Sequence, residues 1–210
     1  DDIGWGLDFA TLKEWDMDEP SHKRYLNDFF TGKHPGSDSR GELYNDDPVT
    51  QDARFCGTTA SMCGIEAALF EKDDEKLKRG IREDLMLHAY MLTQSGIPML
   101  YSSDEIGRLN DYSYKEDPDK AADSRYIHRG AFQWELAGKR KSKSSVEGQI
   151  FQTLDRMEQI RSQESVFDKD CDVYTYDVHD DSILCILRQK GNERFIGIFN
   201  FSDSEKTAWM

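Results

Sequence analysis

Cysteine is scarce in this sequence and is never arranged for metal binding. The four cysteines among 210 residues are Cys56, Cys63, Cys171 and Cys185. They form no Cys-x-x-Cys pair, and no His-x-x-x-His pair accompanies them, which argues against the usual zinc motifs. Scattered cysteines of this kind are typical of free, buried thiols in a reducing compartment. We therefore expect no metal, no cofactor and a cytoplasmic location.

Positive charge and long apolar runs are also lacking. The 27 Lys and Arg residues are outnumbered by 41 Asp and Glu residues, and the formal net charge is -14. Nucleic acids and anionic membranes attract proteins with a positive field, so neither is an expected partner. No stretch reaches the length of a transmembrane helix, and no internal repeat is present. The composition fits a globular protein that acts on an uncharged substrate.

The most informative stretch is residues 96–107, Gly-Ile-Pro-Met-Leu-Tyr-Ser-Ser-Asp-Glu-Ile-Gly. Its apolar part, 97–101, is short and opened by breakers, which is typical of a fully buried strand. It then turns polar, and a segment with helical periodicity lies on each side. The order helix, buried strand, polar loop, helix predicts a parallel α/β fold. In such folds the residues after a strand, here 104–107, lie at the rim of a site.

The first 55 residues show little regular pattern apart from one helix. Asp18 can cap this helix, Pro20 suits its first turn, and Gly32 can end it. The segment 33–49 is expected to be loop. A segment this long with little regular structure is typical of a lid or an inserted subdomain.

Helical periodicity returns after residue 57 and is lost again near residue 163. Helices are expected over 58–69, from Asp73 or Asp74 to about 95, and after a capping box at 144–147. His88 falls on the inward face of the second of these helices and is expected to be a satisfied core histidine.

The last part of the chain changes to a strand period. Strands are expected over 173–178, 183–188 and 195–201, with turns between them. Short strands in succession predict an antiparallel meander, so a small β domain should begin near Phe167.

Clusters of charged residues leave two interpretations open. An Asp1-Asp2 pair is more often a solvated turn than a site, and neighbouring carboxylates cannot flank one glycosidic bond from both sides. For Asp104-Glu105, anchoring of the loop and a catalytic role have equal weight. The segment 123–129 and Arg54 could join buried ion-pair networks or form exposed, screened charges.

Three stretches taken together resemble the family 13 glycoside hydrolases, the α-amylase family. They are Asp-Asp-Ile-Gly-Trp at 1–5, residues 96–107 with Leu-Asn-Asp at 109–111, and Asp-Ser-Arg-Tyr-Ile-His-Arg at 123–129. Within that family the patterns are most similar to those of the amylosucrases, and the resemblance runs in order over nearly the whole chain.

The resemblance implies an α/β fold, a (β/α)8 barrel with a C-terminal β-sandwich domain. Residues 1–166 would be the C-terminal part of the barrel, with strands 7 and 8 and their helices. Residues 3–55 would be an insertion subdomain after strand 7, and residues 167–210 the start of the antiparallel β domain.

The resemblance also implies roles for five residues. Asp1 corresponds to the carboxylate that binds the glucosyl hydroxyls and stabilises the oxocarbenium-like transition state. Asp2 and Arg54 correspond to contacts on the acceptor side, and Tyr25 to an aromatic residue near the acceptor. Arg125 corresponds to the arginine whose salt bridge closes the bottom of an exo-acting pocket.

The implied activity is cleavage or transfer of α-glucosyl units with retention, through a covalent glucosyl-enzyme intermediate. Amylosucrase-like transfer from sucrose to an α-glucan is the first interpretation. The alternatives are hydrolysis by an α-amylase or α-glucosidase, and a non-catalytic homologue of the barrel. The family's nucleophile Asp and acid/base Glu lie on strands 4 and 5, which these residues do not include. We therefore expect a fragment that is inactive alone.

One position departs from the family pattern. Ser103 stands where the family has Gly before Asp-Glu. If that position needs a backbone conformation that only Gly reaches easily, Ser103 is strained.

Overall fold

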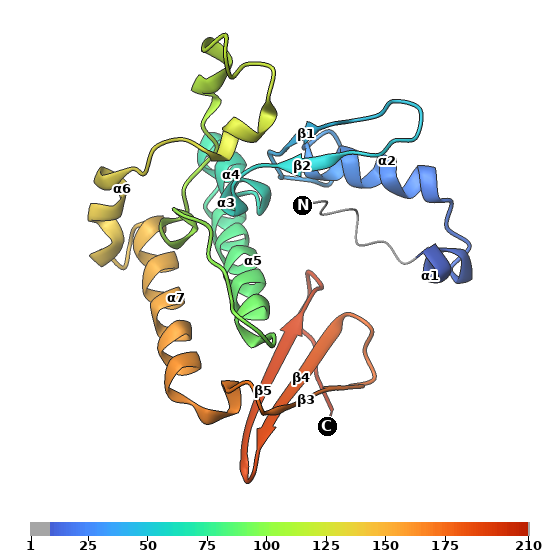
Figure 1. Cartoon of the computed structure of the whole chain (residues 1–210), viewed down its shortest axis with the longest axis vertical. Helices are drawn as coiled ribbons and strands as arrows, with labels where there is room; N and C mark the ends of the chain where they lie inside the picture. Colours follow the sequence, from blue (N-terminus) through green and yellow to red (C-terminus); the bar gives the residue numbers. More distant parts are fainter. Residues whose placement is uncertain (1–8, 210) are drawn as a thin grey trace.

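The computed structural model describes residues 9–209, which form a mixed α and β protein (Figure 1). Its α-helices are α1 (Phe9–Glu14), α2 (Glu19–Phe30), α3 (Thr59–Met62), α4 (Ile65–Glu71), α5 (Asp74–Thr93), α6 (Trp134–Gly138) and α7 (Val146–Gln163). Its 3-10 helices are η1 (Asp104–Ile106), η2 (Tyr112–Glu116), η3 (Ser124–His128), η4 (Lys139–Lys141) and η5 (Ser165–Phe167). Its strands are β1 (Glu42–Tyr44), β2 (Arg54–Cys56), β3 (Asp172–Tyr176), β4 (Ile183–Lys190) and β5 (Glu193–Asn200). In the part of the chain that the structure describes, no helix is long and apolar enough to cross a membrane.

The core lies between α5 and α7, which run side by side (Figure 1). Each helix carries an apolar stripe at helical spacing, so packing the two stripes together removes both from water. The fully packed residues of this core are Ala60, Ile65, Ile81, Ile150 and Leu154.

The predicted caps of the helices are confirmed where local chemistry decides them. The Asp18 carboxylate accepts from the backbone amide of Ser21, and Pro20 lies in the first turn of α2. Asp73 caps α5 by accepting from the amides of Glu75 and Lys76.

Two predicted helix boundaries are wrong by a small, explicable amount. The helix expected over 58–69 is split into α3 and α4, because Gly64 adopts a left-handed φ of 83° that breaks the helix between them. The cap of α7 is Ser145 rather than Ser144, and it accepts from the amide of Gly148. Gly148 fits there because a Cβ at this position would lie 1.7 Å from the Ser142 carbonyl oxygen.

The long N-terminal segment contains more regular structure than the sequence predicts. A two-stranded antiparallel hairpin joins β1 to β2, so 33–49 is not wholly loop, and Tyr44 pairs with Arg54 across it. The Phe30 ring packs on the Phe55 ring with centroids 4.7 Å apart, which ties α2 to this hairpin.

The C-terminal meander is confirmed as a three-stranded antiparallel sheet in the order β3-β4-β5. It lies at the end of α5 (Figure 1). Phe199 of β5 meets Tyr90 of α5 edge to face at 5.9 Å, and Phe195 packs on Phe167 at 4.9 Å. The sheet therefore docks on the helices through one of its faces.

The buried strand predicted over 97–101 is wrong for this structure. The segment forms no strand, and Ile97 and Met99 are 90% and 80% exposed, although Leu100 packs against the core. A buried parallel strand needs hydrogen-bonded neighbours, and residues 9–209 contain no strand that pairs with this segment. Both sheets of the described chain are antiparallel.

Candidate functional site

Two arginines that are far apart in sequence, Arg54 and Arg125, are both neighbours of Tyr44. Arg54 is its cross-strand partner in the β1–β2 hairpin. The guanidinium of Arg125, from η3, lies over the Tyr44 ring with its Cζ 4.3 Å from the ring centroid. This distance is within the range of a cation–π contact. We call Tyr44, Arg54, Asp123 and Arg125 the Tyr44 cluster.

Arg125 is held in place by a bidentate ion pair within its own segment. Its Nε and Nη2 donate to the Oδ1 and Oδ2 of Asp123 at 2.8 and 2.7 Å. The hydrogen bond from Arg125 lowers the pKa of Asp123 from 3.8 to about 2. The pair is partly exposed, with 39% of the Arg125 side chain open to solvent. Of the two alternatives for this segment, a partly exposed ion pair with fixed geometry is the one found.

The hairpin and η3 form one packed unit beneath the cluster. Cys56 and Ile127 are buried together, and Tyr44 packs against them. The Ser124 hydroxyl donates to the Leu43 carbonyl oxygen at 2.8 Å. Arg54 and Arg125 are therefore presented from two elements with a fixed relation, which is what a binding site requires.

Tyr25, another of the predicted site residues, is not part of this cluster. Tyr25 lies on α2, is 44% exposed, and among the described residues makes ring contacts with His22, Phe29 and His34. Asp1 and Asp2 lie outside the described residues.

The rim residues 103–107 form a tight turn around η1. Ser103 has a φ of 84°, and Gly107 has a φ of 59°. Glu105 accepts from the backbone amide of Ser103 at 2.7 Å, so of its two predicted roles the anchoring of the loop is observed. Asp104 instead faces inward, where Thr59 Oγ1 donates to its Oδ2 at 3.3 Å.

The turn is connected to the Tyr44 cluster through the residues that follow it. The side-chain oxygen of Asn110 accepts from the amide of Thr58 at 2.9 Å. The amide of Asp111 donates to the carbonyl oxygen of Ile127, in η3, at 2.8 Å. A displacement of the turn would therefore reach the segment that carries Arg125.

We predict that Ser103→Gly stabilises the protein by about 1 kcal/mol. Ser103 is 2% exposed, its φ is one that side chains disfavour, and its hydroxyl has no partner among the described residues. Glycine removes the strain and the unsatisfied hydroxyl, and these gains exceed the added entropy of the unfolded chain. Urea unfolding of both proteins measures the difference.

Ser102→Gly is the control for this prediction. Ser102 is exposed and has no positive φ. Glycine there should lower the free energy of unfolding by up to about 1 kcal/mol. Equal losses in the two variants would show that residue 103 is not strained.

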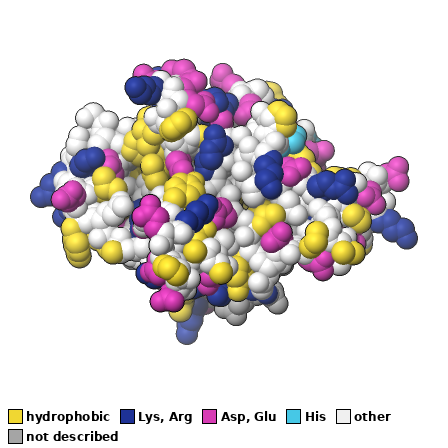
Figure 2. All heavy atoms as spheres, turned by 90° about the horizontal axis from the view of Figure 1, so that it is seen from above, with side chains coloured by type: hydrophobic (Ala, Val, Ile, Leu, Met, Phe, Trp, Pro, Cys, Tyr) yellow, Lys and Arg dark blue, Asp and Glu magenta, His cyan; other side chains and the backbone are white. Residues whose placement is uncertain are grey.

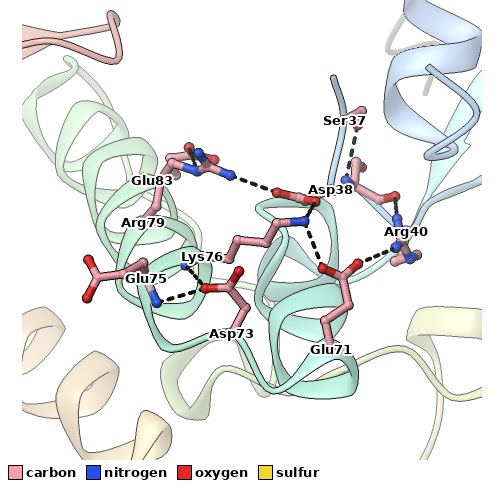
Figure 3. Close-up of polar contacts among 10 residues, drawn as sticks. Ser37, Asp38, Arg40, Glu71, Asp73, Glu75, Lys76, Arg79 and Glu83 are labelled. Atoms are coloured by element: carbon pink, nitrogen blue, oxygen red, sulfur yellow. Dashed lines mark hydrogen bonds and ion pairs between the residues drawn. The ribbon is translucent and has the colours of Figure 1, made fainter. Parts of the chain in front are cut away.

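A second charged cluster proves to be neutralised internally (Figure 3). Lys76 Nζ lies 2.8 Å from Asp38 Oδ1 and 2.7 Å from Glu71 Oε2, and Arg79 Nη2 lies 2.8 Å from Asp38 Oδ2. These pairs fasten the loop before β1 to α4 and α5. Within residues 9–209 no group of three or more His, Cys, Asp or Glu side chains is suited to a metal ion.

Tyr44 is the member of the cluster for which the sequence predicts no role. Its surroundings, Glu-Leu-Tyr-Asn, carry no motif. Its place under Arg125 depends on a contact between segments about eighty residues apart. No known family model matches the sequence.

Proposed function

We propose that this chain belongs to a carbohydrate-active enzyme that cleaves or transfers α-glucosyl units with retention, with amylosucrase-like transfer from sucrose as the favoured reaction. The observation that supports it is that Tyr44 pairs across the hairpin with Arg54 and lies under the guanidinium of Arg125. The family resemblance assigns Arg54 to the acceptor side and Arg125 to the bottom of the pocket, so their proximity is expected if both line one substrate site.

The chemistry of the Tyr44 cluster suits an uncharged sugar. Guanidinium groups donate several hydrogen bonds from a planar fork, and sugar hydroxyls accept them. Asp123 compensates the charge of Arg125, so the pair can face a neutral ligand without attracting anions. The net charge of -14 is consistent with such a ligand.

The exposed segment 97–100 supports a barrel as the parent fold. None of its backbone groups has a hydrogen-bond partner among the described residues. Ile97 and Met99 are among the exposed large hydrophobic residues of the described chain. Seen from above, hydrophobic side chains elsewhere on the surface are interspersed with charged ones (Figure 2). A barrel would pair the backbone of 97–100 with strands on both sides and bury Ile97 and Met99.

In the proposed reaction the residues of this chain would bind and stabilise rather than attack. Asp1 would stabilise the oxocarbenium-like transition state, and Arg125 would close the pocket around the glucosyl unit. Asp2, Arg54 and Tyr25 would contact the acceptor side. The nucleophile and the acid/base would come from segments outside these 210 residues.

The test uses the protein expressed from its complete gene. It is incubated with sucrose alone and with a maltooligosaccharide alone, and fructose, glucose and polymer are followed. Release of fructose with a growing α-glucan is the expected result. Shortening of the maltooligosaccharide with sucrose untouched would indicate a hydrolase instead, and no change in either sugar would contradict the enzyme proposal.

A further inference from the structure

A buried histidine connects the core helix α5 to the rim turn. His88 is 5% exposed, and both of its ring nitrogens face acceptors. Nδ1 lies 2.8 Å from the carbonyl oxygen of Asp84 and 3.4 Å from its Oδ2. Nε2 lies 3.8 Å from Asp104 Oδ2, across the gap between α5 and η1. The Asp84 carbonyl oxygen can only accept, so Nδ1 carries a proton, and a second proton on Nε2 would face the Asp104 carboxylate within ion-pair distance.

The surroundings of the ring reinforce the charged form. Asp84 is fully buried, and its carboxylate oxygens have no hydrogen-bond partner among the described residues. Burial raises the pKa of Asp84, and the nearby His88 acts in the opposite direction. When Asp84 is ionised, the His88 imidazolium is the charge that compensates it. Burial alone would lower the pKa of His88, but the facing carboxylate of Asp104 and the hydrogen bond and charge of Asp84 outweigh it and raise this pKa to about 10.

The remaining polar groups around the ring are neutral or distant. Burial and the nearby charge of Asp84 raise the pKa of the Cys63 thiol. This thiol therefore stays protonated and carries no charge at neutral pH. Thr59 donates its hydroxyl to Asp104 without adding charge. On the far side of Asp104, burial lowers the pKa of His128 and so favours its neutral form.

We propose that His88 is a positioning residue, an imidazolium held between Asp84 and Asp104 that fixes the turn 103–107 and, through it, the segment carrying Arg125. Nothing in the described chain other than His88 joins Asp104 to α5 by charge. The contact between His88 and Asp104 holds the turn whether or not the protein binds a sugar.

The sign of the pH effect follows from the direction of the pKa change. The folded pKa lies above the ordinary value of 6.5, so the charge stabilises the fold fully below pH 6.5. This contribution is lost as the pH rises from 6.5 through about 10. The turn should therefore be firmly held at neutral pH and loosen in alkaline solution.

The first measurement is an NMR titration of the protein from its complete gene, with histidines labelled with carbon-13 at Cε1. His88→Gln assigns the His88 signal. His179 is the internal control, because it also faces a carboxylate, Asp177 at 3.8 Å, but is 78% exposed. The His88 signal should still report imidazolium at pH 8, and the exposed His179 gives the reference curve recorded in the same sample. A neutral His88 ring at pH 7.5 would overturn the proposal.

The second measurement tests the coupling to the turn. Asp104→Asn should lower the midpoint of the His88 titration by one pH unit or more, because it removes a facing carboxylate. In His88→Gln, amide exchange at pH 7 should become at least tenfold faster at residues 104, 106, 107 and 108, whose amides are hydrogen-bonded within the turn. His179→Gln should leave this exchange unchanged.

Two results of the second measurement would count against the positioning role. One is an unchanged His88 midpoint in Asp104→Asn. The other is faster exchange spread equally over α7 and the β3–β5 sheet, which would show general destabilisation. If His88→Gln does not fold, the His88 signal is assigned through the backbone resonances of its neighbours in α5, and the titrations of the unmodified protein and of Asp104→Asn then decide the question.

Discussion

Replacement of Arg188 by methionine is expected to lower the free energy of unfolding by about 3 kcal/mol or more. Arg188 lies near the C-terminal end of β4 and is 1% exposed, yet no carboxylate of the described residues pairs with it. Its Nε donates to the Val166 carbonyl oxygen at 2.8 Å, and its Nη1 to that of Thr93 at 2.9 Å. Nη2 lies 2.7 Å from Cys171 Sγ.

These contacts place the guanidinium at the end of α5, where carbonyl groups lack partners within the helix. Arg161 of α7 also binds the residues that follow α5, because it donates to the carbonyl oxygens of Gln94 and Gly96. Cations are favoured near the negative end of a helix dipole. Methionine would fill the volume but leave two buried carbonyl groups unsatisfied, and each such loss costs about 1–3 kcal/mol.

Arg194→Met is the control for this prediction, since Arg194 is an exposed residue of the adjacent strand β5. Its effect on urea unfolding should stay within about 0.5 kcal/mol. Arg188→Lys should recover little, because an ammonium group cannot reach acceptors in three directions as the planar fork does. Equal midpoints for Arg188→Met and Arg194→Met would mean that Arg188 does not hold the sheet to α5.

The residues of α2 and of the three-stranded sheet show what the sequence could predict. Asp18 and Pro20 act on the backbone within one turn, and the strands β3 to β5 pair with their nearest neighbours in sequence. Both kinds of interaction depend on residues close along the chain. They can therefore be inferred from spacing and residue type alone.

The segment 97–101 shows where such inference ends. Its residues are those of a buried strand, but burial is a property of the neighbours, and residues 9–209 supply none. The Tyr44 cluster has the same limit, because the approach of η3 to the hairpin is a tertiary contact. The Asp84–His88 pair is an intermediate case: the spacing of four residues on a helix predicts the contact, but not the approach of Asp104.

Under the proposed function, Arg125→Ala is expected to lower kcat/KM for sucrose by about a hundredfold. Alanine removes the bidentate pair with Asp123 and the contact with Tyr44, so the bottom of the pocket loses its fixed geometry. Arg125→Lys should lose nearly as much, because a single ammonium group cannot form both hydrogen bonds to the carboxylate.

Arg129→Ala separates this effect from a general loss of positive charge in the same segment. Arg129 is exposed, and its guanidinium lies 5.9 Å from the centroid of the Tyr126 ring, outside the Tyr44 cluster. Its kcat/KM should stay within about twofold of the unmodified protein, since screened surface charges contribute little. A hundredfold loss of kcat/KM in Arg129→Ala as well would show that the combined positive charge of the segment 123–129 is responsible, and not the specific contacts of Arg125. An unchanged kcat/KM in Arg125→Ala would remove Arg125 from the sugar pocket, because the exposed pair would then be only a surface ion pair.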